Sequence, residues 1–261
     1  MYFRLPSLFL LSLFYLLYLP LLSGQVPRDF DVKAFNEKFA VARWLGDYDR
    51  TTWEALQSLR KEKGFREKML SEGFEHFCYQ DADGVWHAVL GHFFFTYDTL
   101  HPERTGRGTP PSSSELQPYV QALHTATERL KKDHADLPVR MSRYIRKNPD
   151  GTFTVWFFPA PFQNDMAIYG GEFSYTLDPS GSRILESSGY YSGKFKGFPL
   201  EKGLKEITLD YSDIDEPTLG GIFFVWQYKE FFDKIRLQTA RSISTILHDH
   251  SGGYYWVHVE R

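Results

Sequence analysis

The sequence predicts an α+β protein in which an antiparallel sheet of successive hairpins packs against a few helices. Three observations support this class. Short segments of alternating polar and apolar residues are joined by tight turns, other segments space their apolar residues as a helix does, and 17% of the 261 residues are aromatic. Aromatic residues favour strands and bury large areas. A chain of this length can build its core without disulfides.

Three turns of one chemistry are the strongest structural signal in the chain. They are Asp81-Ala-Asp-Gly84, Asn148-Pro-Asp-Gly151 and Asp178-Pro-Ser-Gly181. Each begins with a polar residue and ends with glycine, which tolerates the positive φ that these turns need. We therefore expect three tight hairpins.

Residues 1–24 predict a secretory signal peptide. A single cation, Arg4, precedes a predominantly apolar run over residues 5–22, and small residues follow it. The run exceeds the ~7–15 residues usual for such a segment, so an uncleaved membrane anchor through residues 5–22 is the alternative. Two prolines interrupt the ends of the run and favour cleavage near Gly24. Either way we expect an extracytoplasmic protein, secreted or periplasmic, that meets the membrane only through this segment.

Residues 25–98 predict a helical pair followed by a β-hairpin. Apolar residues lie at helical spacing over 31–45, and Thr51-Thr-Trp-Glu54 has the form of a capping box that opens a second helix. The hairpin pairs 74–79 with 85–97 across the first of the three turns.

The segment 99–114 (TLHPERTGRGTPPSSS) has no periodicity and is rich in Gly, Pro and Ser. It is either a long surface loop or an interdomain linker. A linker would separate a domain over 25–98 from an antiparallel α+β domain over 115–261. A loop would leave one continuous domain over 25–261.

Residues 115–261 are expected to be mostly strand. Ser112-x-x-Glu115 is a second capping box and opens a helix to about Asp133. A later helix is predicted over 217–232, with Asp213 or Asp215 as its N-cap. The predicted strands are 139–146, 152–158, 172–177, 182–191, 236–247 and 254–259, the last two forming a hairpin across His248–Gly253.

The stretch from Tyr169 to Tyr191 is interpreted as scaffold. Alternation places Phe173, Tyr175 and Leu177 on one face of a strand and the polar residues between them on the other. The pair Gly170-Gly171 is less expected inside a strand. It marks a bulge, a strand start or close approach by another backbone, and is therefore the candidate ligand contact of this region.

The stretch GGEFSYTLDPSG, followed by ILES, resembles a pattern of uncharacterised secreted bacterial proteins. Those proteins carry a strand of two glycines, an acidic and an aromatic residue, and then a D-x-x-G turn. The resemblance covers about a fifth of the chain. It implies an extracytoplasmic location and brings no known activity.

His248-Asp-His250 is the best chemical candidate in the sequence. Two imidazoles two residues apart on a strand share a face and could bind a metal ion. A third ligand would come from elsewhere in the fold, for which His258 and His92 are available.

Cys78 is the single cysteine, so it forms no intramolecular disulfide. Its reading as a nucleophile depends on the register of the first hairpin. If Gly84 takes the bulge position of the turn, Cys78 faces Ala88 and His87 faces Tyr79, which places the thiol and the imidazole on opposite faces. We therefore expect a buried structural cysteine.

The charge balance argues against nucleic acid, because the formal net charge is -3. The basic group Arg140, Arg143, Arg146 and Lys147 is interpreted as a solvated face. The sequence as a whole predicts a non-catalytic binding or assembly module for a protein or carbohydrate ligand. The alternative is a secreted hydrolase, metal-dependent through His248 and His250 or using a carboxylate pair.

Overall fold

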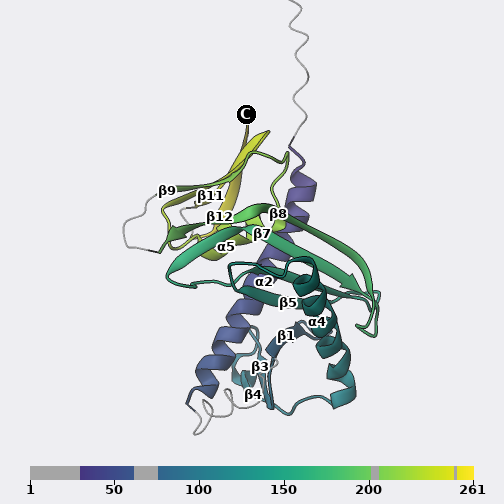
Figure 1. Cartoon of the computed structure of the whole chain (residues 1–261). Helices are drawn as coiled ribbons and strands as arrows, with labels where there is room; N and C mark the ends of the chain where they lie inside the picture. The colour runs from purple at the N-terminus through teal and green to yellow at the C-terminus, as the bar shows by residue number, and fades with distance from the viewer. Residues whose placement is uncertain (1–29, 62–75, 201–205, 250–251) are drawn as a thin grey trace, which may run out of the picture.

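The computed structural model describes residues 30–61, 76–200, 206–249 and 252–261. The fold is α+β, as the sequence predicts. Within those ranges three α-helices, α2 (Val32–Leu59), α4 (Ser113–Asp133) and α5 (Leu219–Tyr228), pack against three sheets of four strands (Figure 1). The helix α2 runs along most of the folded part in this view.

Each sheet uses strands that are consecutive in the chain. The first contains β1 (His76–Gln80), β2 (Trp86–Leu90), β3 (Phe93–Tyr97) and β4 (Gly106–Arg107). The second contains β5 (Met141–Lys147), β6 (Phe153–Pro159), β7 (Met166–Leu177) and β8 (Ile184–Pro199). The third contains β9 (Glu206–Tyr211), β10 (Lys234–Thr239), β11 (Ser242–His248) and β12 (Tyr254–Glu260).

The three predicted turns are confirmed. Gly84, Gly151 and Gly181 have φ of 81°, 85° and 72°, and each donates its backbone N–H to the carbonyl of the first turn residue at 3.1, 2.9 and 2.8 Å. The first hairpin also has the expected bulged register, with Cys78 opposite Ala88 and Tyr79 opposite His87. Local turn chemistry thus sets these pairings.

The expected helical pair is instead one helix, α2. The Thr51 hydroxyl donates to the Asp47 carbonyl at 2.8 Å inside the helix, so Thr51 does not cap a new one. The buried positions continue through this point as Leu45, Thr51 and Ala55, and packing keeps the helix intact. The true N-cap is Asp31, whose side chain accepts from the Ala34 N–H at 2.9 Å.

The β5–β8 sheet lies between two helical layers. Along β6, Phe153, Val155 and Phe157 join a buried cluster with α4, whereas Trp156 and Phe158 join the larger cluster that includes α2 and α5. This strict alternation follows from the two-residue period of a strand.

A bulge at Gly170 reverses that alternation along β7. Gly170 has φ of 102°, and the pairing with β8 shifts between Tyr169 and Gly171. Tyr169 therefore packs on the α5 side, while Phe173 packs on the α4 side. A Cβ at Gly170 would lie 3.0 Å from the carbonyl oxygen of Lys194 in β8. The close approach at the glycine pair is thus made by the chain's own next strand.

Two long predicted segments prove to be two strands each. The segment 85–97 turns at Gly91-His92 into β2 and β3, and 236–247 turns at Ala240-Arg241 into β10 and β11. The predicted last hairpin across His248–Gly253 is present, now between β11 and β12. Apolar content alone does not show where such a segment reverses.

The third sheet contains a parallel pair that the sequence did not predict. Strands β9 and β10 run parallel and are joined by α5. The N-cap of α5 is Thr218 rather than Asp213 or Asp215, whose carboxylates bind Tyr190 and Arg241. The two aspartates thus bind side chains that are distant in sequence and do not cap the helix.

Residues on both sides of the segment 99–114 share one buried cluster, which includes Leu45, Trp86, Phe223 and Leu237. The segment itself contains a short 3-10 helix (Pro102–Arg104) and β4, which pairs with β3. It therefore runs along the folded part that the structure describes.

Candidate functional site

Of the two histidines predicted to bind a metal ion, the structure describes only His248. His248 is exposed at the end of β11, with its ring 4.0 Å from that of Tyr254, and His250 lies outside the described residues. The third candidate, His258, stacks on Phe30 at 4.1 Å and contacts the Ser244 hydroxyl at 2.8 Å. His92 lies in the first sheet's β2–β3 turn. Among the described residues no group of three metal-ligating side chains occurs.

Cys78 is the buried cysteine that the sequence predicts. Its Sγ lies 3.1 Å from the Thr52 hydroxyl of α2. Burial raises the pKa of the thiol to about 12, so it stays protonated near neutral pH. Because the thiolate is the reactive form, this residue packs and does not attack.

The basic group does not form one solvated face. The guanidinium of Arg146 lies against two neighbouring indole rings, 5.7 Å from the centroid of Trp44 and 5.1 Å from that of Trp156. Arg140 and Arg143 line a cavity instead. The prediction was wrong because α2, distant in sequence, packs along β5.

That cavity, of about 610 Å³, is bounded by α2, β5, the β6–β7 connection and α5. We call it the Asp49 cavity. Its apolar wall consists of Trp53, Leu56, Met141, Ala160, Pro161 and Phe162. Its polar lining includes Tyr48, Asp49, Thr52, Ser142, Tyr144 and Gln227, and its cationic lining includes Arg50, Arg140 and Arg143.

Asp49 is the central polar group of the cavity. Its Oδ2 accepts hydrogen bonds from the Tyr144 hydroxyl at 3.1 Å and from the Gln227 side-chain amide at 2.9 Å. Burial raises the pKa of Asp49 to about 7, although both hydrogen bonds lower it. Its other oxygen, Oδ1, has no hydrogen-bond partner in the described part of the chain. The carboxyl can therefore accept or donate a hydrogen bond to a ligand near neutral pH.

A second polar group at this cavity is poorly satisfied. Tyr48 is 3% exposed, and its hydroxyl forms no hydrogen bond with any described residue, although the backbone of Cys78 lies near it. Buried hydroxyls usually have a partner. Tyr48 lines the same cavity, but its hydroxyl is shielded from solvent beside Cys78, so Asp49 remains the central polar group there.

The β6–β7 connection forms one edge of the cavity in an unusual backbone conformation. Phe162, Asn164 and Asp165 have φ of 54°, 54° and 55°, which non-glycine residues seldom adopt. The side-chain amide of Gln163 binds the backbone N–H and carbonyl of Arg140 at 3.0 and 3.1 Å and holds the connection on β5. Such local strain clusters at functional sites.

A second buried carboxyl, Glu172 of β7, lies at another cavity of about 490 Å³. We call this the Glu172 cavity; its walls include Lys38, Trp156, Ser174, Tyr190, Glu216 and Thr218. Glu172 accepts a hydrogen bond from the backbone N–H of Gly220 in the first turn of α5. Burial raises its pKa to about 7, while bonds from Thr218 and Gly220 oppose that rise. Its carboxylate caps the helix, a structural use of the charge.

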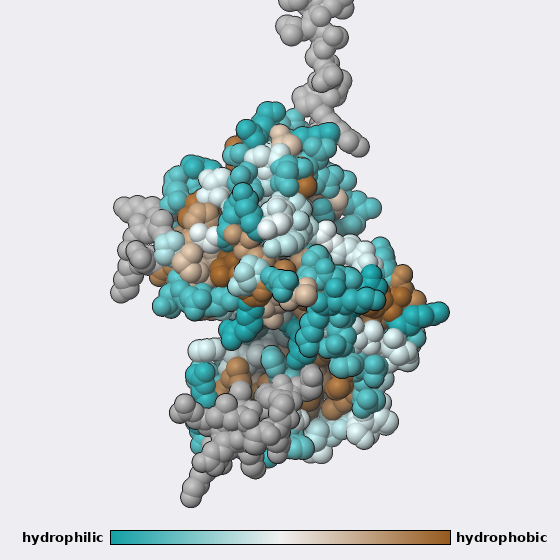
Figure 2. All heavy atoms as spheres, in the orientation of Figure 1, coloured by the Kyte–Doolittle hydropathy of each residue, from teal (hydrophilic) through white to brown (hydrophobic). Residues whose placement is uncertain are grey.

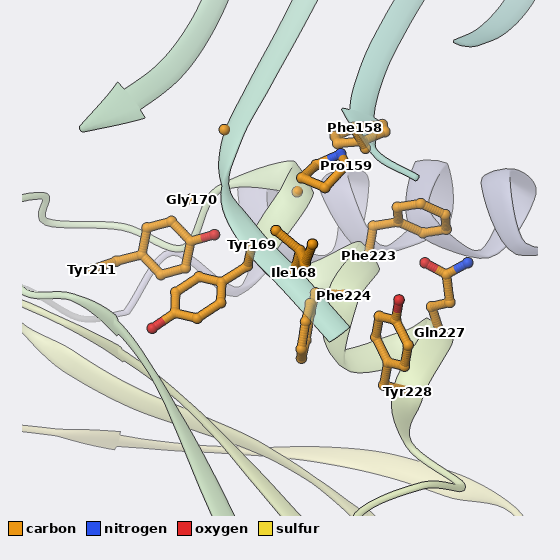
Figure 3. Close-up of a pocket in the computed structure, with 12 residues that line it drawn as sticks. Phe158, Pro159, Ile168, Tyr169, Gly170, Tyr211, Phe223, Phe224, Gln227 and Tyr228 are labelled. Atoms are coloured by element: carbon orange, nitrogen blue, oxygen red, sulfur yellow. The ribbon is translucent and has the colours of Figure 1, made fainter. Parts of the chain in front are cut away.

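The interior between these two cavities is tightly packed. A space of only about 20 Å³ is left between β7 and α5, room for about one water molecule. Figure 3 shows the rings of Tyr169, Phe224 and Tyr228 around it, and Gln227 on the last turn of α5. The two larger cavities are spaces among the described residues with room for a ligand.

Neither carboxyl was singled out from the sequence. A signal for Asp49 existed, because it follows Ala42 and Leu45 at helical spacing and so puts an acid on the apolar stripe of α2. Glu172 gave no such signal, since its place in the alternation is that of an outward polar residue.

No known protein family matches the chain, and neither the curated proteins nor the solved structures contain a significant match. The described helices include none with the length and apolar character needed to cross a bilayer.

Proposed function

We propose that this protein is a secreted or periplasmic, non-catalytic binding protein whose ligand occupies the Asp49 cavity. One observation carries the proposal. A cavity of about 610 Å³ combines an apolar wall with a buried carboxyl that has an oxygen to spare. Small-molecule sites have this size and this combination of apolar walls with a few convergent polar groups.

The chemistry of the lining favours binding over hydrolysis. Asp49 is the one carboxylate among the described residues that line the cavity. Its hydrogen-bond donors, Tyr144 and Gln227, are neutral side chains that orient it. Glycoside hydrolysis, by contrast, pairs two carboxyl groups across the bond that breaks. The extracytoplasmic location is supported by the composition of residues 1–24.

The test uses the neutral fluorescent probe N-phenyl-1-naphthylamine, which brightens in apolar surroundings. We expect saturable binding to the wild-type protein and its loss in Ser142→Trp, because the added indole fills the Asp49 cavity. The matched control is Ser174→Trp, which fills the Glu172 cavity from the same sheet and should leave binding within about twofold. Binding that survives in Ser142→Trp but fails in Ser174→Trp would place the probe in the Glu172 cavity and contradict the proposal. Absence of probe binding to the wild-type protein would reject the proposal.

N-terminal sequencing of the exported protein tests the location. A first residue of Gln25 indicates release after signal cleavage, and Met1 indicates an anchored form. Recovery of the full chain from the cytosolic fraction would contradict both.

A further inference from the structure

We infer that the ligand of the Asp49 cavity is an amphipathic anion, an apolar molecule with a carboxylate head held by Arg140. The inference deepens the proposed function and rests on it. It assigns the apolar body to the wall that contains Trp53 and Phe162, and the head to the cationic lining.

The charge of the lining is opposite to that of the chain. The formal net charge is -3, yet Arg50, Arg140 and Arg143 all line this one cavity. Arg50 forms an ion pair with Asp47, with 3.6 Å between the guanidinium and the carboxylate. Arg140 is exposed and forms no ion pair with any described residue, so its guanidinium remains available to an incoming acid. A guanidinium binds a carboxylate in a bidentate manner and more strongly than a neutral donor does.

The backbone of Arg140 is held in place by hydrogen bonds, although its side chain is exposed. The Gln163 side chain binds both its N–H and its carbonyl, and that carbonyl also accepts from the backbone N–H of Ala160 at 2.8 Å. Three hydrogen bonds thus hold the backbone of Arg140 next to the β6–β7 connection. A fixed base reduces the conformational entropy lost when the guanidinium binds.

The apolar wall presents more exposed aromatic surface than a folded protein usually leaves. Trp53 is 55% exposed and Phe162 is 48% exposed, both among the large apolar side chains least covered in the described chain. Phe162 is supported from behind by Tyr228 and Phe231, with ring centroids 5.6 and 5.3 Å away. Rigid aromatic faces of this kind contact an apolar ligand at low entropic cost.

Asp49 is compatible with an anion at neutral pH because its carboxyl is not fully ionised there. A cationic ligand, in contrast, would approach three guanidinium groups. Like charges brought together in a partly desolvated space cost binding free energy, which discriminates against the cation.

The experiment displaces bound N-phenyl-1-naphthylamine with three twelve-carbon compounds, each below the concentration at which it aggregates. They are dodecanoate, dodecan-1-ol and dodecyltrimethylammonium. At pH 6, where the Asp49 carboxyl is mostly neutral, we expect dodecanoate to displace the probe at a concentration at least tenfold lower than either of the others, because only its head matches the arginines.

Arg140→Gln should raise the concentration of dodecanoate needed by about tenfold and leave that of dodecan-1-ol unchanged. The matched control is Arg183→Gln, which removes an exposed arginine in the β7–β8 turn, away from the cavity. Equal displacement by acid and alcohol, or equal effects of the two substitutions, would overturn the inference. If the inference fails but Ser142→Trp blocks probe binding, the Asp49 cavity remains the proposed binding site. If the wild-type protein does not bind the probe at all, the proposed binding site is rejected as well.

Discussion

Asp49 and Glu172 are two buried carboxyls with the same raised pKa and different uses. Both lie in the layer between the β5–β8 sheet and the helices α2 and α5, and burial raises the pKa of each to about 7. Glu172 is bound by the first turn of α5, whereas Asp49 is bound through Gln227 at the last turn. The comparison shows that two carboxyls with similarly raised pKa values can have different partners.

The partners differ in kind. Glu172 accepts a hydrogen bond from a backbone N–H that the start of a helix leaves without a partner. Its negative charge also interacts favourably with the dipole of that helix. Asp49 is bound by two neutral side chains through one oxygen and lines a cavity. One carboxyl caps a helix, and the other lines a cavity.

The substitution Glu172→Ala should have the largest effect on stability. It leaves the N–H of Gly220 without its acceptor and removes the charge from the start of α5, so we expect a loss of about 2–3 kcal/mol in the free energy of unfolding. Urea denaturation measures it, and binding of the neutral probe should persist in the folded fraction. A loss below about 0.5 kcal/mol would show that Glu172 is not the cap.

The pH dependence of stability should respond to Asp49→Asn by about 2 kcal/mol. The pKa of Asp49 is about 7 in the folded state and near 3.8 when unfolded, so the folded state binds more protons between these values. The free energy of unfolding therefore falls as pH rises from about 4 to about 7, and Asn removes this part of the fall. The expected change in the free energy of unfolding is smaller than the full pKa shift of Asp49 would give, because Asp49 lines a cavity and solvent screens its charge.

Urea denaturation of wild type and Asp49→Asn at pH 4, 6 and 8 measures this difference. Glu172→Gln is the companion variant. It should likewise reduce the fall in the free energy of unfolding as pH rises. A wild-type profile that rises with pH over this window, and keeps that rise in Asp49→Asn, would contradict the raised pKa.

The substitution Asp49→Ala should cost about 1 kcal/mol, less than Glu172→Ala. The hydroxyl of Tyr144 and the amide of Gln227 lose one acceptor, but the cavity beside them admits water as a replacement. Thermal unfolding of the two alanine variants at pH 7 compares them directly. The contrast between the two carboxyls fails if Asp49→Ala proves the more destabilising.

The smallest effect on stability is expected from Trp53→Ala. Its side chain is 55% exposed, so the free energy of unfolding should change by no more than about 0.5 kcal/mol. The affinity for N-phenyl-1-naphthylamine should nevertheless fall about fivefold, because an aromatic wall of the cavity is lost. The matched control is Leu100→Ala, because Leu100 is 82% exposed and lies away from the cavity.

Several features of the fold follow from neighbouring residues and were predictable. The turns at Gly84, Gly151 and Gly181 need only four residues each, and the bulge at Gly170 was one of the readings of its glycine pair. The single helix α2 was not predictable from the capping box at Thr51, because packing decided whether that motif would be used. The parallel pairing of β9 with β10 likewise depends on where α5 docks.

Figure 2 shows a surface that is largely hydrophilic on the face in view, with apolar patches between. Along β10 and β11 the alternation of buried and half-buried residues can be followed in the sequence itself. The cavities lie between elements and have no counterpart in any one segment.

By itself the sequence determined the α+β class, the hairpins and the buried state of Cys78, because these depend on turn chemistry and on a two-residue period. Only the tertiary structure decided what the two carboxyls do. Asp49 meets Tyr144 and Gln227, 95 and 178 residues away along the chain, and Glu172 meets Gly220 from 48 residues away. Contacts over such separations arise from the packing of whole helices and sheets, and that packing placed one acid at a helix end and the other at a cavity.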